Sequence, residues 1–139
     1  RGRIDQWQAL AAESEVALGY DGPLSLHVIA VPNAVEQIVD NYIDNALSVS
    51  PAHTVIEVKV RVDGTLALLQ VLDQGPGLSA EECVRAFDRF WRANSDRHGS
   101  GIGLAIVEQL ARASGGKAEL LPRPGGGLIA SASFETARN

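Results

Sequence analysis

The strongest pattern in the chain is a set of apolar residues spaced three or four apart between Val35 and Leu47. Such spacing places the apolar side chains on one side of a helix, which predicts an amphipathic helix packed on a core. Pro51 cannot continue a helix, so we expect the helix to end before it. Pro32 is expected in the first turn, where the missing amide hydrogen would have had no partner.

Downstream the pattern changes to strict alternation of apolar and charged residues over residues 56–63. Alternation predicts a strand with one buried and one exposed face. Asp63 and Gly64 favour a type I′ hairpin turn. The more uniformly apolar segment 65–72 is therefore expected to return beside the first strand.

Shorter patterns predict the N-terminal elements. Segments 15–20 and 24–31 are rich in strand-forming residues and are separated by the turn residues 21–23. Segment 4–15 carries apolar residues at helical spacing. It is expected to be either a short amphipathic helix or the tail of a preceding helical element.

The C-terminal half predicts helices and a hairpin. Ser79 followed by Glu82 forms a capping box, which indicates a short helix over residues 79–86. A further helix is expected from about residue 101 to residue 114, because a glycine pair follows it. Segments 117–121 and 128–134 suit a final hairpin.

Together these elements predict an α+β fold, a two-layer α/β sandwich in which a mixed sheet is covered on one face by three helices. A chain of 139 residues suits one domain with one core, so we expect a single domain over residues 1–139. Residues 1–13 are the segment that could instead be the tail of an upstream helical linker.

Composition narrows the function classes. The net charge of −5, without a cluster of lysine and arginine, argues against a nucleic-acid partner. No apolar run approaches the roughly 18–20 residues of a membrane span, so we expect this segment to make no direct membrane contact. The chain opens with Arg1 and contains no methionine, and we therefore expect it to be part of a longer protein.

The predicted central helix carries candidate metal ligands. Asn41 and Asn45 are four residues apart, which places both side chains on one helix face. Amide oxygens suit Mg²⁺ and, being neutral, add no charge beside a triphosphate. Taken alone, the pair is more simply explained as part of an exposed polar surface.

A second candidate follows the returning strand. Asp73 at a strand end can accept a hydrogen bond from the exocyclic amine of adenine, where guanine has a carbonyl. Gly75 and Gly77 let the chain turn sharply and lie close to a flat ring. The same residues would also suit an ordinary turn from a strand to a helix.

A glycine-rich segment, residues 99–103, precedes the last predicted helix, where backbone amides and the helix dipole can meet phosphate. Its glycine spacing fits neither a Rossmann motif nor a P-loop. In the segment before it, Arg89 or Arg92 could reach the phosphates from a lid anchored by aromatic residues. The alternative is a surface loop with solvated arginines.

The chain carries, in order, the segments DNYIDNA, DQGPGLS, FDRFWR and GSGIGLAIV. In sequence and spacing they resemble the N, G1, F and G2 boxes of sensor histidine kinases. The resemblance implies the Bergerat-type ATP-binding fold shared with gyrase, Hsp90 and MutL, with the nucleotide between the N-box helix and the lid. ATP and Mg²⁺ are the cofactors it implies.

The resemblance also implies roles for individual residues. Asn45, with Asn41, would hold Mg²⁺, and Asp73 would bind adenine. Asn45 and Arg92 would be the catalytic residues. The remaining nucleotide-binding residues would be Gly75, Gly77, Leu78, Arg89, Ser100, Gly101, Ile102, Gly103 and Leu104.

The implied activity is transfer of the ATP γ-phosphoryl group to a histidine. None of the histidines in this chain has the sequence setting of the family's acceptor, so the acceptor is expected in an upstream dimerisation domain. Little turnover is then expected from this domain alone. The implied setting is a two-component system: a cytoplasmic domain of a membrane-anchored sensor whose phosphate passes to a response regulator.

Other functions remain open at this stage. A serine kinase of the anti-sigma-factor type has the same fold. A degenerate module that binds only a nucleotide or a partner is also consistent with the sequence, because Ser48 and Val49 stand where many relatives carry a basic residue and an aromatic one.

Overall fold

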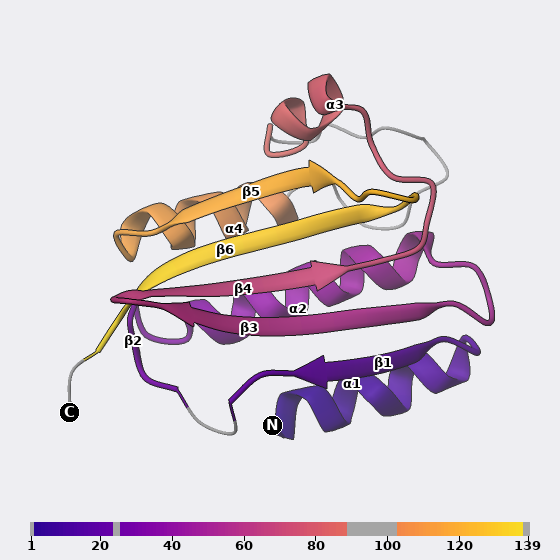
Figure 1. Ribbon diagram of the computed structural model, residues 1–139, viewed down its shortest axis with the longest axis horizontal. Helices are drawn as coiled ribbons and strands as arrows, with labels where there is room; N and C mark the ends of the chain where they lie inside the picture. Colours follow the sequence, from indigo (N-terminus) through magenta and orange to yellow (C-terminus); the bar gives the residue numbers. More distant parts are fainter. Residues whose placement is uncertain (1, 24–25, 89–102, 138–139) are drawn as a thin grey trace.

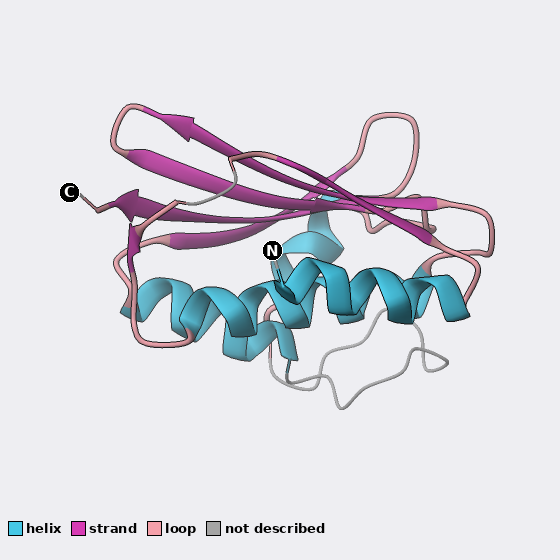
Figure 2. Ribbon diagram, turned by 90° about the horizontal axis from the view of Figure 1, so that it is seen from below, coloured by secondary structure: helices cyan, strands magenta, loops and turns pink. Residues whose placement is uncertain are grey.

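The computed structural model describes residues 2–23, 26–88 and 103–137. Within these residues the chain forms a mixed six-stranded sheet whose helices lie on one side (Figures 1 and 2). In chain order the elements are α1 (Gly2–Glu13), β1 (Ala17–Asp21), β2 (Val28–Ile29), α2 (Ala34–Val49), β3 (Val55–Asp63), β4 (Leu66–Leu72), α3 (Ala80–Arg85), α4 (Gly103–Ala113), β5 (Lys117–Pro122) and β6 (Leu128–Thr136).

The strands follow the order β1-β3-β4-β6, and both β5 and β2 pair with the other edge of β6. β1 runs parallel to β3, and the remaining pairs are antiparallel. Figure 2 shows α1, α2 and α4 side by side beneath the sheet, and Figure 1 shows α3 beyond β5. The predicted α+β sandwich with a mixed sheet is therefore confirmed.

Helix α1 packs onto the same core as the other elements. Ala11 is fully buried, and Ile4 and Trp7 pack against the buried cluster. The Trp7 indole Nε1 donates a hydrogen bond to Asp40 Oδ1 on α2 at 2.9 Å. Gln8 Nε2 donates to the carbonyl oxygen of Leu18 on β1 at 3.0 Å. These bonds join α1 to the helix layer on one side and to the sheet on the other.

Helix α2 forms where the apolar spacing predicts it. Its stripe of Ile38, Tyr42, Ile43 and Ala46 is buried against the sheet. The helix begins later than expected: the residue preceding it is Asn33, in the left-handed conformation with φ 66, and Pro32 stands before that. The Ala34 amide donates to the carbonyl oxygen of Val31 at 3.0 Å, so Pro32 and Asn33 are the central residues of a turn that precedes the helix. Asparagine tolerates the left-handed conformation better than most residues.

The predicted strand 24–31 is much shorter in the structure, where β2 comprises Val28–Ile29. The reason lies in the edge it uses. β5 already occupies the edge of β6 as far as Ser133, and β2 pairs only with Glu135 and Thr136 beyond it. Residues 24 and 25 lie outside the described residues.

The β3–β4 hairpin forms as predicted, but its turn lies one residue later than expected and is of a different type. Asp63 pairs with Leu66, so Gly64 and Thr65 form the loop. Of these, only Gly64 has a positive φ, 63°, which is the pattern of a type II′ turn. The capping box of α3 is confirmed, with the Ser79 side chain accepting from the Glu82 amide at 3.1 Å.

Candidate functional site

The two asparagines lie at the border of the buried stripe of α2. Asn41 and Asn45 are both half-buried, while Tyr42 and Ala46 beside them face the core. Asn41 also lies against the first residue of α4: a Cβ built on Gly103 would be 3.1 Å from Asn41 Oδ1. The amide of Asn41 therefore sits beside the N-terminal end of α4, where helix amides carry partial positive charge.

Asp73 follows β4 and is almost completely buried, with 2% of its surface exposed. Its Oδ1 accepts hydrogen bonds from the amides of Gly75, at 2.9 Å, and Leu128, at 3.2 Å. Its own amide donates to the carbonyl of Leu128 at 3.0 Å. Backbone donors thus offset the cost of burying this carboxylate and fix its orientation.

Close backbone packing explains the glycines that follow Asp73. A Cβ on Gly75 would lie 2.7 Å from the carbonyl oxygen of Val49 at the end of α2. Gly77 has φ 74, and a Cβ there would lie 2.6 Å from the carbonyl oxygen of Gly127. The turn after β4 is therefore packed between the end of α2 and the β5–β6 loop.

These contacts bring the two groups of candidate residues to the same end of the molecule. Val49, which touches Gly75, lies one helical turn after Asn45. The Ser48 hydroxyl donates to the carbonyl oxygen of Asn45 at 2.7 Å and so stays on the helix. The end of α2 that carries the asparagines thus adjoins the turn that carries Asp73.

The described residues include only part of the predicted phosphate-binding set. Arg89, Arg92, Ser100, Gly101 and Ile102 lie outside them. Gly103 and Leu104 form the first turn of α4, and both Leu78 and Leu104 pack partly buried against the core.

One residue of this region was missed by the sequence analysis. Arg123, in the β5–β6 loop, donates from Nη1 to the carbonyl oxygen of Asp73 at 2.9 Å and from Nη2 to Glu57 Oε1 at 3.0 Å. The only signal was the run Arg-Pro-Gly-Gly-Gly, which predicted a hairpin loop and gave no reason to connect it with Asp73.

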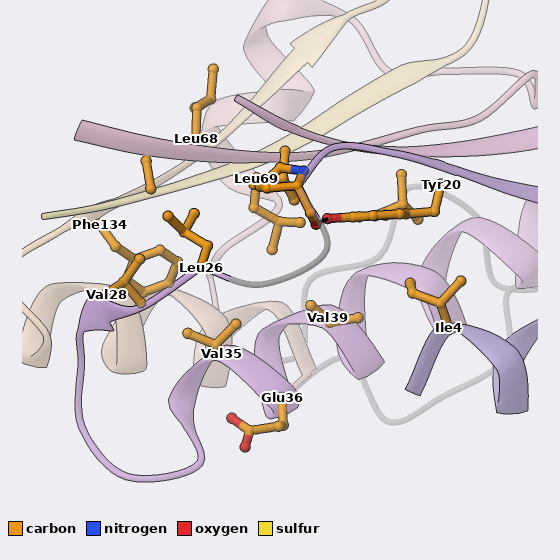
Figure 3. A pocket seen from close by; sticks show the side chains of 14 residues that line it. Ile4, Tyr20, Leu26, Val28, Val35, Glu36, Val39, Leu68, Leu69 and Phe134 are labelled. Atoms are coloured by element: carbon orange, nitrogen blue, oxygen red, sulfur yellow. Dashed lines mark hydrogen bonds between the residues drawn. The ribbon is translucent and has the colours of Figure 1, made fainter. Parts of the chain in front are cut away.

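A cavity of about 340 Å³ lies elsewhere, between the sheet and the N-terminal half of α2 (Figure 3). Val35 and Val39 line it from the helix, Leu69 and Phe134 from the sheet, and Tyr20 from β1. None of the asparagines nor Asp73 is among its lining residues. The cavity is therefore separate from the candidate site.

In the part of the chain that the structure describes, no cluster of three or more histidine, cysteine, aspartate or glutamate side chains could hold a metal ion. Amide oxygens, such as those of Asn41 and Asn45, can also ligate a cation together with oxygens from a ligand or water. No helix among the described residues has the length and apolar character needed to cross a membrane.

Comparison with known families agrees with this geometry. Residues 30–138 match the family of histidine kinase-, DNA gyrase B- and HSP90-like ATPases. The match includes α2, the Asp73 turn and α4, and it covers most of the chain.

Individual relatives are sensor proteins. The chain is 36% identical over 123 residues to the sensor protein CreC of Escherichia coli, covering 86% of this chain and 26% of CreC. It is 38% identical over 101 residues to the sensor protein kinase PmrB of Pseudomonas aeruginosa, covering 68% of this chain and 21% of PmrB. The chain thus spans about a quarter of each of these relatives.

The solved structure of the mycobacterial sensor histidine kinase MprB superposes with a TM-score of 0.84 at 26% identity, covering 99% of this chain and 95% of that one. Fold, motif order and sequence all lead to the same assignment. The chain belongs to the histidine kinase-, DNA gyrase B- and HSP90-like ATPases, and its relatives within that family are sensor histidine kinases.

Proposed function

We propose that this domain binds ATP with Mg²⁺ between α2 and the turn after β4, and serves as the catalytic domain of a two-component sensor histidine kinase. The observation that carries the proposal is the position of Asp73. Its buried carboxylate is oriented by two backbone amides and lies beside the C-terminal end of α2, the helix that bears Asn41 and Asn45.

Asp73 would select the base. Its carboxylate would accept a hydrogen bond from the exocyclic amine of adenine, whereas guanine would present a carbonyl oxygen and repel it. Gly75, Gly77 and Leu78 would line the pocket around the ring. The two glycines pack closely against the backbone of Val49 and Gly127, and this packing holds the turn in place beside Asp73.

Asn45, with Asn41, would hold Mg²⁺. Neutral amide oxygens suit an ion whose charge is already balanced by a triphosphate. When bound, the ion would supply charge neutralisation at the phosphates. Asn45 would then count as a catalytic residue because it fixes the position of the ion.

The phosphates would lie towards the N-terminus of α4. Gly103, Leu104 and the preceding residues Ser100, Gly101 and Ile102 would offer backbone amides. Arg89 and Arg92 would add positive charge from the lid, with Arg92 closest to the transferred group. The part of this proposal that rests on described residues is the placement of Gly103 beside Asn41.

The reaction would transfer the γ-phosphoryl group to a histidine nitrogen. The bond from phosphorus to the β–γ bridging oxygen breaks, a phosphorus–nitrogen bond forms, and ADP and the imidazole proton leave. This chain would contribute positioning and charge stabilisation. The acceptor would lie in the parent protein's dimerisation domain, so this domain alone would turn over slowly.

The wider setting is proposed from the relatives, which are named as sensor proteins. The parent would be anchored in the cell membrane with this domain in the cytoplasm, and it would pass its phosphate to a response regulator. The acidic net charge of −5 supports partners other than nucleic acid.

Titration calorimetry tests the binding proposal. ATP with Mg²⁺ should bind with a measurable heat, GTP should bind far more weakly, and Asp73→Asn should abolish most of the preference for adenine. Asp63→Asn, the same change at the exposed far end of the β3–β4 hairpin, is the control and should leave binding unchanged. Absence of ATP binding by the wild-type domain would refute the proposal.

The chemical class of the acceptor needs a separate readout. After incubation with radiolabelled ATP and a dimerisation domain from a related kinase, label on a phosphohistidine is acid-labile, whereas label on a phosphoserine survives acid. Acid-stable label would contradict the histidine kinase assignment. Asn45→Ala should abolish the transfer while far-UV circular dichroism shows an intact fold.

A further inference from the structure

Arg123 links the β5–β6 loop to the residue proposed to bind adenine. Its guanidinium donates to the main-chain carbonyl of Asp73 at 2.9 Å and to the Glu57 carboxylate at 3.0 Å. The Arg123 side chain is only 19% exposed. This degree of burial distinguishes it from exposed surface arginines, whose ion pairs contribute little.

The guanidinium reaches across the end of the sheet. Glu57 is the cross-strand neighbour of Leu72, the residue before Asp73, so Arg123 connects the start of β3 and the end of β4 with the β5–β6 loop. Ile56 and Val58 on either side of Glu57 face the core, which places Glu57 on the sheet face away from the helices. Arg123 therefore supports Asp73 from the side opposite the helix layer.

The same loop holds Asp73 at further points. The amide of Asp73 donates to the carbonyl oxygen of Leu128, and the amide of Leu128 donates to Asp73 Oδ1. Gly127 packs so closely that a Cβ on it would overlap the carbonyl oxygen of Asp73. With Arg123 on that carbonyl, the loop and the first residue of β6 together contact the amide, the carbonyl and the carboxylate of Asp73.

We propose that Arg123, held by Glu57, is a positioning residue that fixes the direction of the Asp73 carboxylate for adenine recognition. The inference rests on the proposed function of Asp73. A planar base and a carboxylate must meet in a narrow range of angles, so a small rotation of Asp73 weakens that hydrogen bond. The planar guanidinium of arginine can bond to the Asp73 carbonyl oxygen and to the Glu57 carboxylate at once. A lysine ammonium is a single charged group on a flexible side chain and cannot hold both acceptors in the same way.

The test compares ATP with purine riboside triphosphate, which lacks the exocyclic amine and cannot bond to Asp73. Arg123→Met should weaken ATP binding about tenfold, the value expected for loss of a hydrogen bond to a charged group, and leave the analogue within about twofold. Arg123→Lys should recover only part of the loss, and Glu57→Gln should produce a smaller loss in the same direction. Calorimetric titration supplies all of these affinities.

The matched control is Arg61→Met. Arg61 lies on β3 and pairs with exposed Asp21 at 2.7 Å, so its removal takes the same charge from the same sheet without touching Asp73. It should leave both affinities unchanged. Thermal unfolding of each variant identifies any that has lost its fold.

A double-mutant cycle completes the design. If Arg123 acts through Asp73, then Arg123→Met should cost almost nothing in an Asp73→Asn background. Equal weakening of ATP and of the analogue, or additive effects in the cycle, would overturn the proposal while leaving ATP binding intact. Absence of ATP binding by the wild-type domain would instead overturn the proposed function, so the two failures are distinguishable.

Discussion

At the scale of single residues, neighbouring positions on α2 serve either the core or the candidate site. Tyr42 points into the core, where its hydroxyl donates to the carbonyl oxygen of Ser131 at 2.7 Å. Asn41 and Asn45 flank it at the border of the buried stripe. The buried tyrosine thereby fixes the rotation of the helix about its axis, and with it the direction of both asparagines.

Tyr42 gives the stability of the domain a specific pH dependence. Burial, with smaller effects of the Glu108 and Glu119 charges, raises the pKa of Tyr42 well above its usual range. Above about pH 10 the unfolded chain can lose this proton and the folded chain cannot, so the free energy of unfolding should fall by up to about 1.4 kcal/mol per pH unit. That stability is fully present at lower pH.

Urea unfolding of wild type and Tyr42→Phe between pH 8 and 11, a range chosen around the ordinary tyrosine pKa of about 10, checks this expectation. The variant should be less stable at pH 8 by about 1 kcal/mol, because the hydrogen bond to Ser131 is lost. At high pH its free energy of unfolding should not show the additional decrease expected for the wild type. Parallel pH profiles for the two proteins would contradict the argument.

The glycine loop beside Asp73 offers a matched pair of substitutions. Gly126 and Gly127 have φ values of 112° and 104°, so alanine is strained at either position. A Cβ on Gly126 would meet nothing within 4 Å, whereas one on Gly127 would overlap the carbonyl oxygen of Asp73. Gly127→Ala should therefore lower the free energy of unfolding by about 2 kcal/mol more than Gly126→Ala.

Denaturant unfolding of both variants measures that difference directly. Equal losses would mean that backbone conformation alone accounts for Gly127, and that its contact with Asp73 contributes nothing to stability.

Residue types and spacing were enough to predict Asn41, Asn45, Asp73 and the glycines after it as one group, because their order along the chain is distinctive. Arg123 and Gly127 could not be predicted in the same way. Their importance arises from the pairing of β6 with β4, which places Arg123, 50 residues away along the chain, and the rest of its loop directly on Asp73. A single sequence contains no local signal for that contact.

At the scale of elements, the periodic patterns predicted the helices and the long strands well. The differences arise where tertiary contacts set the ends of an element. β2 is short because β5 already pairs with most of that edge of β6, and α2 begins after Asn33 because the chain turns there. The role of the N-terminal segment was left open, since helical spacing alone does not say what a helix packs against.

The packing of α1 leads to a prediction about its two faces. Trp7 packs on the core cluster and bonds to Asp40, whereas Leu10 on the same helix is 49% exposed. Trp7→Ala should lower the free energy of unfolding by about 3 kcal/mol, and Leu10→Ala by less than about 1 kcal/mol.

Chemical denaturation of both variants tests this prediction for α1. Little effect from Trp7→Ala would indicate that α1 contributes no stability and behaves as part of a neighbouring segment. A large effect supports α1 as an integral element of the domain.

At the scale of the whole molecule, the candidate site and the apolar cavity lie on different parts of the same sandwich. The cavity is lined from the N-terminal half of α2 (Figure 3). The candidate residues lie from the middle of α2 towards its C-terminal end and at the end of β4. A search guided by cavity size alone would therefore lead away from the residues proposed to bind the nucleotide.

The central claim is that one nucleotide joins the asparagines of α2 to Asp73. A crystal structure of the domain with a non-hydrolysable ATP analogue and Mn²⁺ tests it most directly, because anomalous scattering locates the ion independently. We predict the adenine amine within hydrogen-bonding distance of Asp73 and Mn²⁺ against the side chain of Asn45. A nucleotide bound in the apolar cavity, or an ion remote from both asparagines, would contradict the account.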